Sequence, residues 1–165
     1  MKKDVSLITN KCSICPRKCA ADRNLRQGSC KAPWEAVVAN VMAHRGEERI
    51  ISGSRGSGTV FFAGCNMRCV FCQNYDISYQ CNGRAINASE LATIFQKLEH
   101  EGVHNINLVT PSHYTSVIAE AIIIAKKKGV KLPFVYNTNS YDSIEALKMI
   151  KEHLKQLELR MDEQL

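Results

Sequence analysis

The sequence lacks an apolar run long enough to cross a membrane. Its longest such run, residues 117–125, is interrupted by Glu120 and covers less than half of the roughly 20 residues that a transmembrane helix needs. No apolar stretch follows Lys2 and Lys3, so the start of the chain does not resemble a secretory signal. We therefore expect a cytoplasmic protein with no membrane partner, in which cysteine thiols stay reduced.

Aromatic residues are also scarce, at 7% of the chain, and none lies beside the one run of positive charge, Lys126 to Lys128. The remaining lysines and arginines, which bring the net charge to +6, are scattered. Proteins that bind single-stranded nucleic acid interleave basic and aromatic side chains. The lysine run instead precedes Gly129 and suits the end of a helix. Nucleic-acid binding is therefore the weakest hypothesis for this chain.

Cysteine, by contrast, is abundant, with eight residues in the chain. Three of them, Cys65, Cys69 and Cys72, follow an apolar, glycine-bounded run at 58–64 that predicts a buried strand. Structural zinc sites and ferredoxin clusters take four protein ligands. Three thiolates on one loop instead suit a [4Fe-4S] cluster with one iron left without a protein ligand, and such an open position predicts reactivity.

This segment resembles the signature of the radical S-adenosylmethionine (SAM) superfamily, C-x3-C-x-aromatic-C, with Phe71 in the aromatic place. The wider stretch 51–74 is similar to pyruvate formate-lyase-activating enzymes. The resemblance implies a [4Fe-4S] cluster whose fourth iron binds SAM, and reductive cleavage of SAM to a 5′-deoxyadenosyl radical. It further implies a reductant such as flavodoxin or ferredoxin, and a glycyl radical enzyme as the protein substrate.

The resemblance also implies a set of site residues, with no catalytic side chain among them. The backbone at Phe71 would lie near the adenine, and 109–111 takes the place of a Gly-Gly-Glu motif that binds the amino group of SAM. Residues 137–139 resemble an Asp-Thr-Asn-Gly stretch, with an asparagine replacing the acidic residue. The implied cluster ligands are Cys65, Cys69 and Cys72, and the implied cofactor-binding residues are Phe71, Asn74, Thr110, Pro111, Asn137 and Asn139.

Four further cysteines, Cys12, Cys15, Cys19 and Cys30, lie in a polar segment that has little to bury. A segment of this kind usually needs a metal or a disulfide to hold it. Four thiolates suit a structural zinc ion or a second iron-sulfur cluster equally well, and disulfides fit a reduced compartment poorly. We expect a metal-held module without chemistry of its own, and we assign no role to Cys81.

The remaining sequence alternates predicted strands and helices. We expect strands at 36–43, 105–109 and 133–136, and helices from Ser89-Glu90 to Gly102, at 115–128 and from about 142. Parallel strands bind ligands at their carboxyl ends. The cysteine loop, residues 110–114 and residues 137–140 should therefore share one edge of the sheet. A glycine-rich loop at 52–58 is expected to lie over the same edge.

The predicted fold is an α/β class, truncated radical SAM partial barrel of about three βα units. We divide the chain into a Cys-rich segment (1–34), a partial barrel (35–149) and a divergent amphipathic helix (150–165) with Ile150, Leu154, Leu157 and Met161 on one stripe. With 165 residues, the chain is short for a barrel of about 250. It is a truncated enzyme, a half-barrel completed by another chain, or a non-catalytic metal-binding relative, and we expect cluster binding before turnover.

Overall fold

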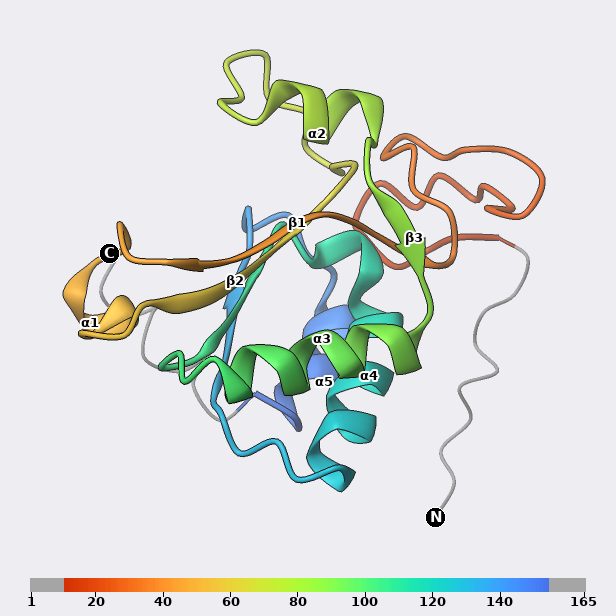
Figure 1. Ribbon diagram of the computed structural model, residues 1–165. Coiled ribbons are helices and arrows are strands. Elements are labelled where there is room, and N and C mark those ends of the chain that lie inside the picture. Colours follow the sequence, from red (N-terminus) through yellow and green to blue (C-terminus); the bar gives the residue numbers. More distant parts are fainter. Residues whose placement is uncertain (1–10, 155–165) are drawn as a thin grey trace.

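The computed structural model describes residues 11–154, which form a mixed α/β fold (Figure 1). Its helices and strands, in chain order, are β1 (Ala36–His44), α1 (Arg49–Ser52), β2 (Ser57–Phe62), α2 (Tyr75–Gln80), β3 (Arg84–Ile86), α3 (Ala88–His100), β4 (Ile106–Val109), η2 (Ser112–Tyr114), α4 (Thr115–Lys127), β5 (Phe134–Asn137) and α5 (Ile144–Lys151).

One sheet of five strands, in the order β3-β1-β2-β4-β5, organises the fold. β2, β4 and β5 are parallel, with Val60 opposite Leu108 and Leu108 opposite Tyr136. β1 and β3 extend the sheet with antiparallel pairing. The three parallel strands confirm the predicted α/β class and its βα units. β3 was not predicted, because a strand of three residues with two of them exposed carries no hydrophobic pattern.

The hydrophobic core lies between the sheet and the helices α3, α4 and α5, which gather on one side of it (Figure 1). Leu91 and Phe95 of α3 and Ile118 and Ile122 of α4 are fully buried. The ring of Phe95 meets that of Phe134 edge to face, with centroids 5.1 Å apart. Each such side chain contributes roughly 1.5–3 kcal/mol by burial, so this layer holds the parallel strands in place.

The first long helix begins one residue earlier than expected. Asn87 caps α3 by accepting a hydrogen bond from Glu90 N at 3.0 Å, and the Glu90 carboxylate accepts one from Asn87 N. This reciprocal capping box starts α3 before Ser89, because only a residue three positions before a glutamate can form it.

The glycine-rich segment 52–58 does not lie over the cysteine loop as predicted. It forms the end of α1 and the turn into β2, and His104 N donates to Gly56 O at 2.9 Å. It therefore lies at the amino ends of β2 and β4, whereas the cysteine loop follows the carboxyl end of β2 (Figure 1). Gly53 and Gly56 have φ values of +50° and +90°, so the glycines serve a tight turn.

The last helix is shorter than the sequence suggested. α5 begins after Ser143, whose hydroxyl accepts a hydrogen bond from Ala146 N at 3.1 Å, and it ends at Lys151. The predicted helix at 150–165 is therefore wrong for 152–154, where Leu154 is buried in a turn. Its remaining residues, Leu157 and Met161 among them, lie outside the described range. Within 11–154, no helix is long and apolar enough to span a bilayer.

Candidate functional site

The cysteine loop connects β2 to α2 and lies at the carboxyl edge of the parallel strands. Gly64 turns the chain there with a φ of +77°, and a Cβ at this position would stand 2.5 Å from Cys30 O. Cys65 is buried, whereas Cys69 and Cys72 are half-buried. The loop therefore presents three thiols at different depths on one turn of backbone.

Two nitrogens donate hydrogen bonds to the sulfur of Cys65. Met67 N lies 3.4 Å from Cys65 Sγ, and Asn139 Nδ2 lies 3.6 Å from it. The Sγ of Cys72 lies 3.3 Å from the Ser78 hydroxyl. Such donors stabilise negative charge on a thiolate and tune a bound metal. Cys65 and Cys72 thus have the polar neighbours that metal-binding thiolates need.

Asn66 fastens the cysteine loop to the loop after β5. Its side chain is fully buried, donates to Tyr141 O at 2.7 Å, and accepts from Asn139 Nδ2 at 2.8 Å. Asn139 Oδ1 in turn accepts from Tyr141 N at 3.0 Å. Asn139, a predicted site residue, therefore contacts both Asn66 and Cys65. Asn66 was not identified as a site residue from the sequence. The only indication in the sequence is that Asn66 directly follows Cys65, an expected ligand.

Thr110 and Asn137 meet through their backbones, with Thr110 N donating to Asn137 O at 3.0 Å. Thr110 has a φ of +57°, a strained conformation for a residue other than glycine, and Pro111 after it is buried. Strain of this kind concentrates at functional sites. The ends of β4 and β5 thus lie together at the edge from which the cysteine loop leaves β2.

The other two predicted cofactor residues lie on the outer part of the loop. Phe71 is 84% exposed, and Val70 beside it is 89% exposed. Asn74 is exposed and precedes α2 without making a side-chain cap. The structure therefore groups Thr110, Asn137 and Asn139 but leaves Phe71 and Asn74 apart from that network.

His113 lies beneath the start of the cysteine loop, a role that the sequence gave no sign of beyond its place after β4. Its side chain is completely buried, and Nε2 lies 2.9 Å from Ala63 O. Burial lowers the pKa of His113 to about 4, the hydrogen bond to Ala63 opposes this shift, and Arg23 lowers the pKa further. The imidazole is therefore neutral near pH 7 and donates from Nε2 to the backbone that leads into Gly64.

We expect this buried histidine to make folding stability depend on pH. An unfolded histidine has a pKa near 6.5, so the unfolded chain binds the proton more tightly. Stability should be complete above about pH 6.5 and fall by up to about 3 kcal/mol as the pH drops to about 4. Urea unfolding between pH 4.5 and 7 measures this. His113→Gln, which can still donate to Ala63 O, should lose that part of the pH dependence, and equal slopes would refute the assignment.

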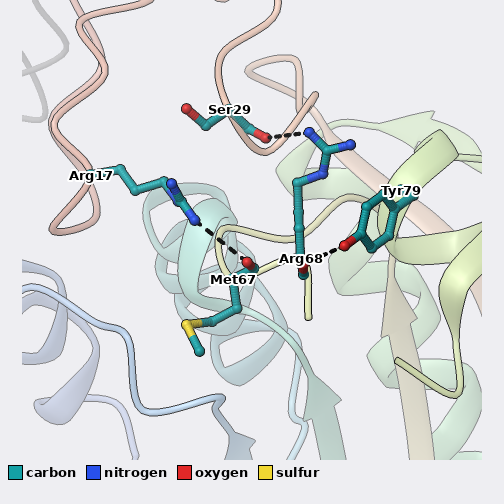
Figure 2. Close-up of a pocket in the computed structure, with 5 residues that line it drawn as sticks. All are labelled: Arg17, Ser29, Met67, Arg68 and Tyr79. Carbon is teal, nitrogen blue, oxygen red and sulfur yellow. Dashed lines mark hydrogen bonds between the residues drawn. The ribbon is translucent and has the colours of Figure 1, made fainter. Parts of the chain in front are cut away.

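An open hollow separates the cysteine loop from the Cys-rich segment (Figure 2). Arg17 donates to Met67 O at 3.4 Å across it, and Arg68 donates to Ser29 O at 3.5 Å. The guanidinium of Arg68 also lies over the ring of Tyr79, 4.5 Å from its centroid, while the Tyr79 hydroxyl donates to Arg68 O. Two arginines therefore connect the segments that hold the two groups of cysteines.

Three soft thiolates on one loop suit an iron-sulfur cluster by their number and chemistry. No group of three or more His, Cys, Asp or Glu side chains within the described part of the chain is close enough to hold one metal ion. Four sulfurs on one zinc ion would stand about 4 Å apart. In a [4Fe-4S] cluster, each cysteine binds a different iron, so the cysteine sulfurs stand further apart than on one zinc ion. The cysteine loop supplies three free thiols and two donors to Cys65 Sγ, which are the groups that such a cluster takes from a protein.

Comparison with known proteins agrees with this arrangement. The profile of the Radical SAM superfamily matches residues 59–162. The chain is also 32% identical over 155 residues to "Uncharacterized protein MJ0674" of Methanocaldococcus jannaschii. This alignment covers 87% of the chain but 43% of the relative, so the chain spans less than half of that protein's length. No solved structure matches the chain. On the profile match, which takes in the cysteine loop and all three parallel strands except the first two residues of β2, the chain belongs to the radical SAM superfamily.

Proposed function

We propose that the chain binds a [4Fe-4S] cluster through Cys65, Cys69 and Cys72 and cleaves SAM reductively. When bound and reduced by a donor such as flavodoxin or ferredoxin, the cluster supplies the electron that breaks a carbon-sulfur bond of SAM, yielding methionine and a 5′-deoxyadenosyl radical that abstracts hydrogen. The observation that carries the proposal is the hydrogen bond from Asn139 Nδ2 to Cys65 Sγ. It connects the three-cysteine loop to the loop that follows β5.

Asn139 and Asn66 have the role of holding the first ligand in place. Asn139 Nδ2 is shared between Cys65 Sγ and Asn66 Oδ1, so one amide orients the thiol and the loop at once. A donor aimed at a thiolate favours its negative charge and raises the reduction potential of the metal it holds. The amides therefore position Cys65 and tune the electron transfer.

The edge formed by the ends of β4 and β5 is our candidate surface for SAM. The strained Thr110, the buried Pro111 and the polar Asn137 lie there. The backbone of Thr110 is hydrogen-bonded to that of Asn137. Carbonyl oxygens and amides of this kind bind the ammonium and hydroxyl groups of a ligand. Phe71 and Asn74 lie on the outer part of the cysteine loop, outside this network, and we propose that they contact SAM from there.

A finer proposal is that the hydrogen taken by the radical comes from a glycine of a partner enzyme. Its support is the similarity of residues 51–74 to pyruvate formate-lyase-activating enzymes, together with membership of the superfamily. The relative from Methanocaldococcus jannaschii carries no assigned activity and is more than twice as long as the aligned part.

A second candidate function is cluster binding without turnover. Val70 and Phe71 leave the loop tip open to water, with 89% and 84% of their surface exposed. Radical chemistry needs water excluded from the reacting atoms. This exposure is the observation in favour of cluster binding without turnover.

Anaerobic reconstitution separates the two functions. The full chain is loaded with iron and sulfide, reduced with dithionite and mixed with SAM, and 5′-deoxyadenosine is measured by mass spectrometry. Under the enzymatic proposal we expect 5′-deoxyadenosine to accumulate, together with a change in the EPR spectrum of the reduced cluster when SAM is added. A loaded cluster that gives neither signal would leave the non-catalytic function standing and reject the enzymatic one.

A further inference from the structure

The Cys-rich segment, residues 11–34, is folded without a hydrophobic core of its own. It contains no helix or strand, and its one leucine, Leu25, is 85% exposed. Its buried residues are Cys12, Cys15, Ala21, Arg23, Cys30 and Ala32. Thiols and methyl groups bury too little apolar surface to order a segment of this length. Something other than hydrophobic burial must therefore stabilise it.

Tight turns bring the four cysteines of this segment together. Lys18 N donates to Cys15 O at 3.0 Å, and Ala20 N donates to Cys12 O at 3.0 Å. Lys18 and Ala20 both have positive φ values, 41° and 50°, which cost energy for residues with a Cβ. The strained turns fold the backbone so that three thiols belong to one short loop.

The fourth cysteine reaches the same place through a second turn. Lys31 N donates to Gly28 O at 2.9 Å, which closes the turn that contains Cys30. A Cβ on Gly28 would stand 2.9 Å from Cys19 Sγ, so Cys19 packs directly against that turn. Cys19 and Cys30 therefore belong to two turns that pack against each other.

Arg23 gives an independent sign of negative charge at this place. Its side chain is 7% exposed and donates to His113 O at 2.8 Å, to Pro33 O at 3.4 Å and to Cys30 Sγ at 3.8 Å. Its Nε has no hydrogen-bond partner, and the carboxylates of residues 11–154 form no ion pair with it. A buried guanidinium is costly unless a negative charge balances it. Thiolates bound to a metal would supply that charge, with Cys30 Sγ already in contact.

We propose that Cys12, Cys15, Cys19 and Cys30 bind a second metal centre as thiolates, with Arg23 balancing its negative charge. Binding of zinc, or transfer of a preassembled cluster, releases the thiol protons to solvent and changes no oxidation state. Four thiolates supply the complete ligand set of a structural zinc ion or of a [4Fe-4S] cluster, and the experiment below distinguishes the two. This centre is separate from the cysteine loop and does not depend on the function proposed for it.

The second centre is joined to the cysteine loop by Arg17, which lies between Cys15 and Cys19 in the sequence. Its guanidinium donates to Asn66 O. It also donates to Met67 O, as Figure 2 shows. The side chain of Asn66 also hydrogen-bonds Cys15, and the Ser143 hydroxyl donates to Ile14 O at 2.9 Å. Metal bound by the Cys-rich segment should therefore hold the backbone that directly follows Cys65.

Metal analysis of matched variants tests the second centre in the full chain. One variant carries Cys65→Ala, Cys69→Ala and Cys72→Ala, and a second adds Cys12→Ala and Cys15→Ala. Both are reconstituted anaerobically, once with iron and sulfide and once with zinc. We expect the first variant to retain about four irons, or one zinc, per chain and the second to retain none. The reconstitution in which the first variant retains metal, with iron and sulfide or with zinc, identifies the metal of the second centre.

Equal metal in the two variants would overturn the proposal, since the extra cysteines would then hold nothing. Alkylation of the unmutated chain gives a readout that does not require any variant to fold. Cys12, Cys15, Cys19 and Cys30 should resist alkylation until a chelator is added, whereas Cys81, which is in neither group, should react in both conditions. If the four cysteines became reactive only after a disulfide reductant was added, they would be held in disulfides. That result would also overturn the proposal.

Discussion

Replacing Cys69 by alanine is expected to remove the cluster of the cysteine loop and, with it, any cleavage of SAM. Iron in the anaerobically reconstituted chain should fall by about four atoms per chain, because a [4Fe-4S] cluster left with two thiolates on this loop is not held. Cys69 is half-buried, and its carbonyl still accepts the hydrogen bond from Cys72 N at 3.1 Å. The variant should therefore keep its fold while losing its metal.

Cys81→Ala is the matched control for this loss. Cys81 is half-buried like Cys69, belongs to neither group of cysteines, and ends α2 with its Sγ 3.9 Å from the Tyr114 hydroxyl. It should keep the full iron content and the same EPR spectrum after reduction. If Cys69→Ala kept the iron, or if Cys81→Ala lost as much, the assignment of the ligands to the C-x3-C-x2-C spacing would fail.

Part of this site could be predicted from the sequence because it follows from local pattern. The parallel strands were found from apolar runs that end in polar loops, and the structure places those ends at one edge of the sheet. The spacing of Cys65, Cys69 and Cys72 depends on no tertiary contact. Membership of the superfamily was accessible for the same reason, since its signature is contained in eight consecutive residues.

The contacts that fix the site could not be predicted in this way. Asn66 meets Asn139, and His113 meets Ala63, across 73 and 50 residues of sequence. No periodicity encodes such pairs, because they depend on how two loops pack once the sheet has formed. The wrong position predicted for residues 52–58 has a similar cause. Their glycines correctly predicted a turn, but the edge of the sheet at which that turn lies is set by the direction of β2.

Gly64→Ala is expected to be the most destabilising single methyl addition near the site. The φ of +77° alone costs a residue with a Cβ about 1–2 kcal/mol. The added Cβ would also stand 2.5 Å from Cys30 O and 3.3 Å from His113 Nε2, so the backbone of the Cys-rich segment must move. We expect a total loss of about 3–5 kcal/mol, since strain and overpacking add, with a fall in melting temperature of about 10 °C.

Gly102→Ala separates the two contributions. Gly102 has a φ of +76°, nearly that of Gly64, but a Cβ there would meet nothing within 4 Å. It should therefore lose only the conformational part, about 1–2 kcal/mol, in urea unfolding. The difference between the two variants measures how firmly Cys30 and His113 hold the start of the cysteine loop. Equal losses in the free energy of unfolding would mean that the backbone of the Cys-rich segment moves aside at no cost. That backbone would then not hold the loop that presents Cys65 in place.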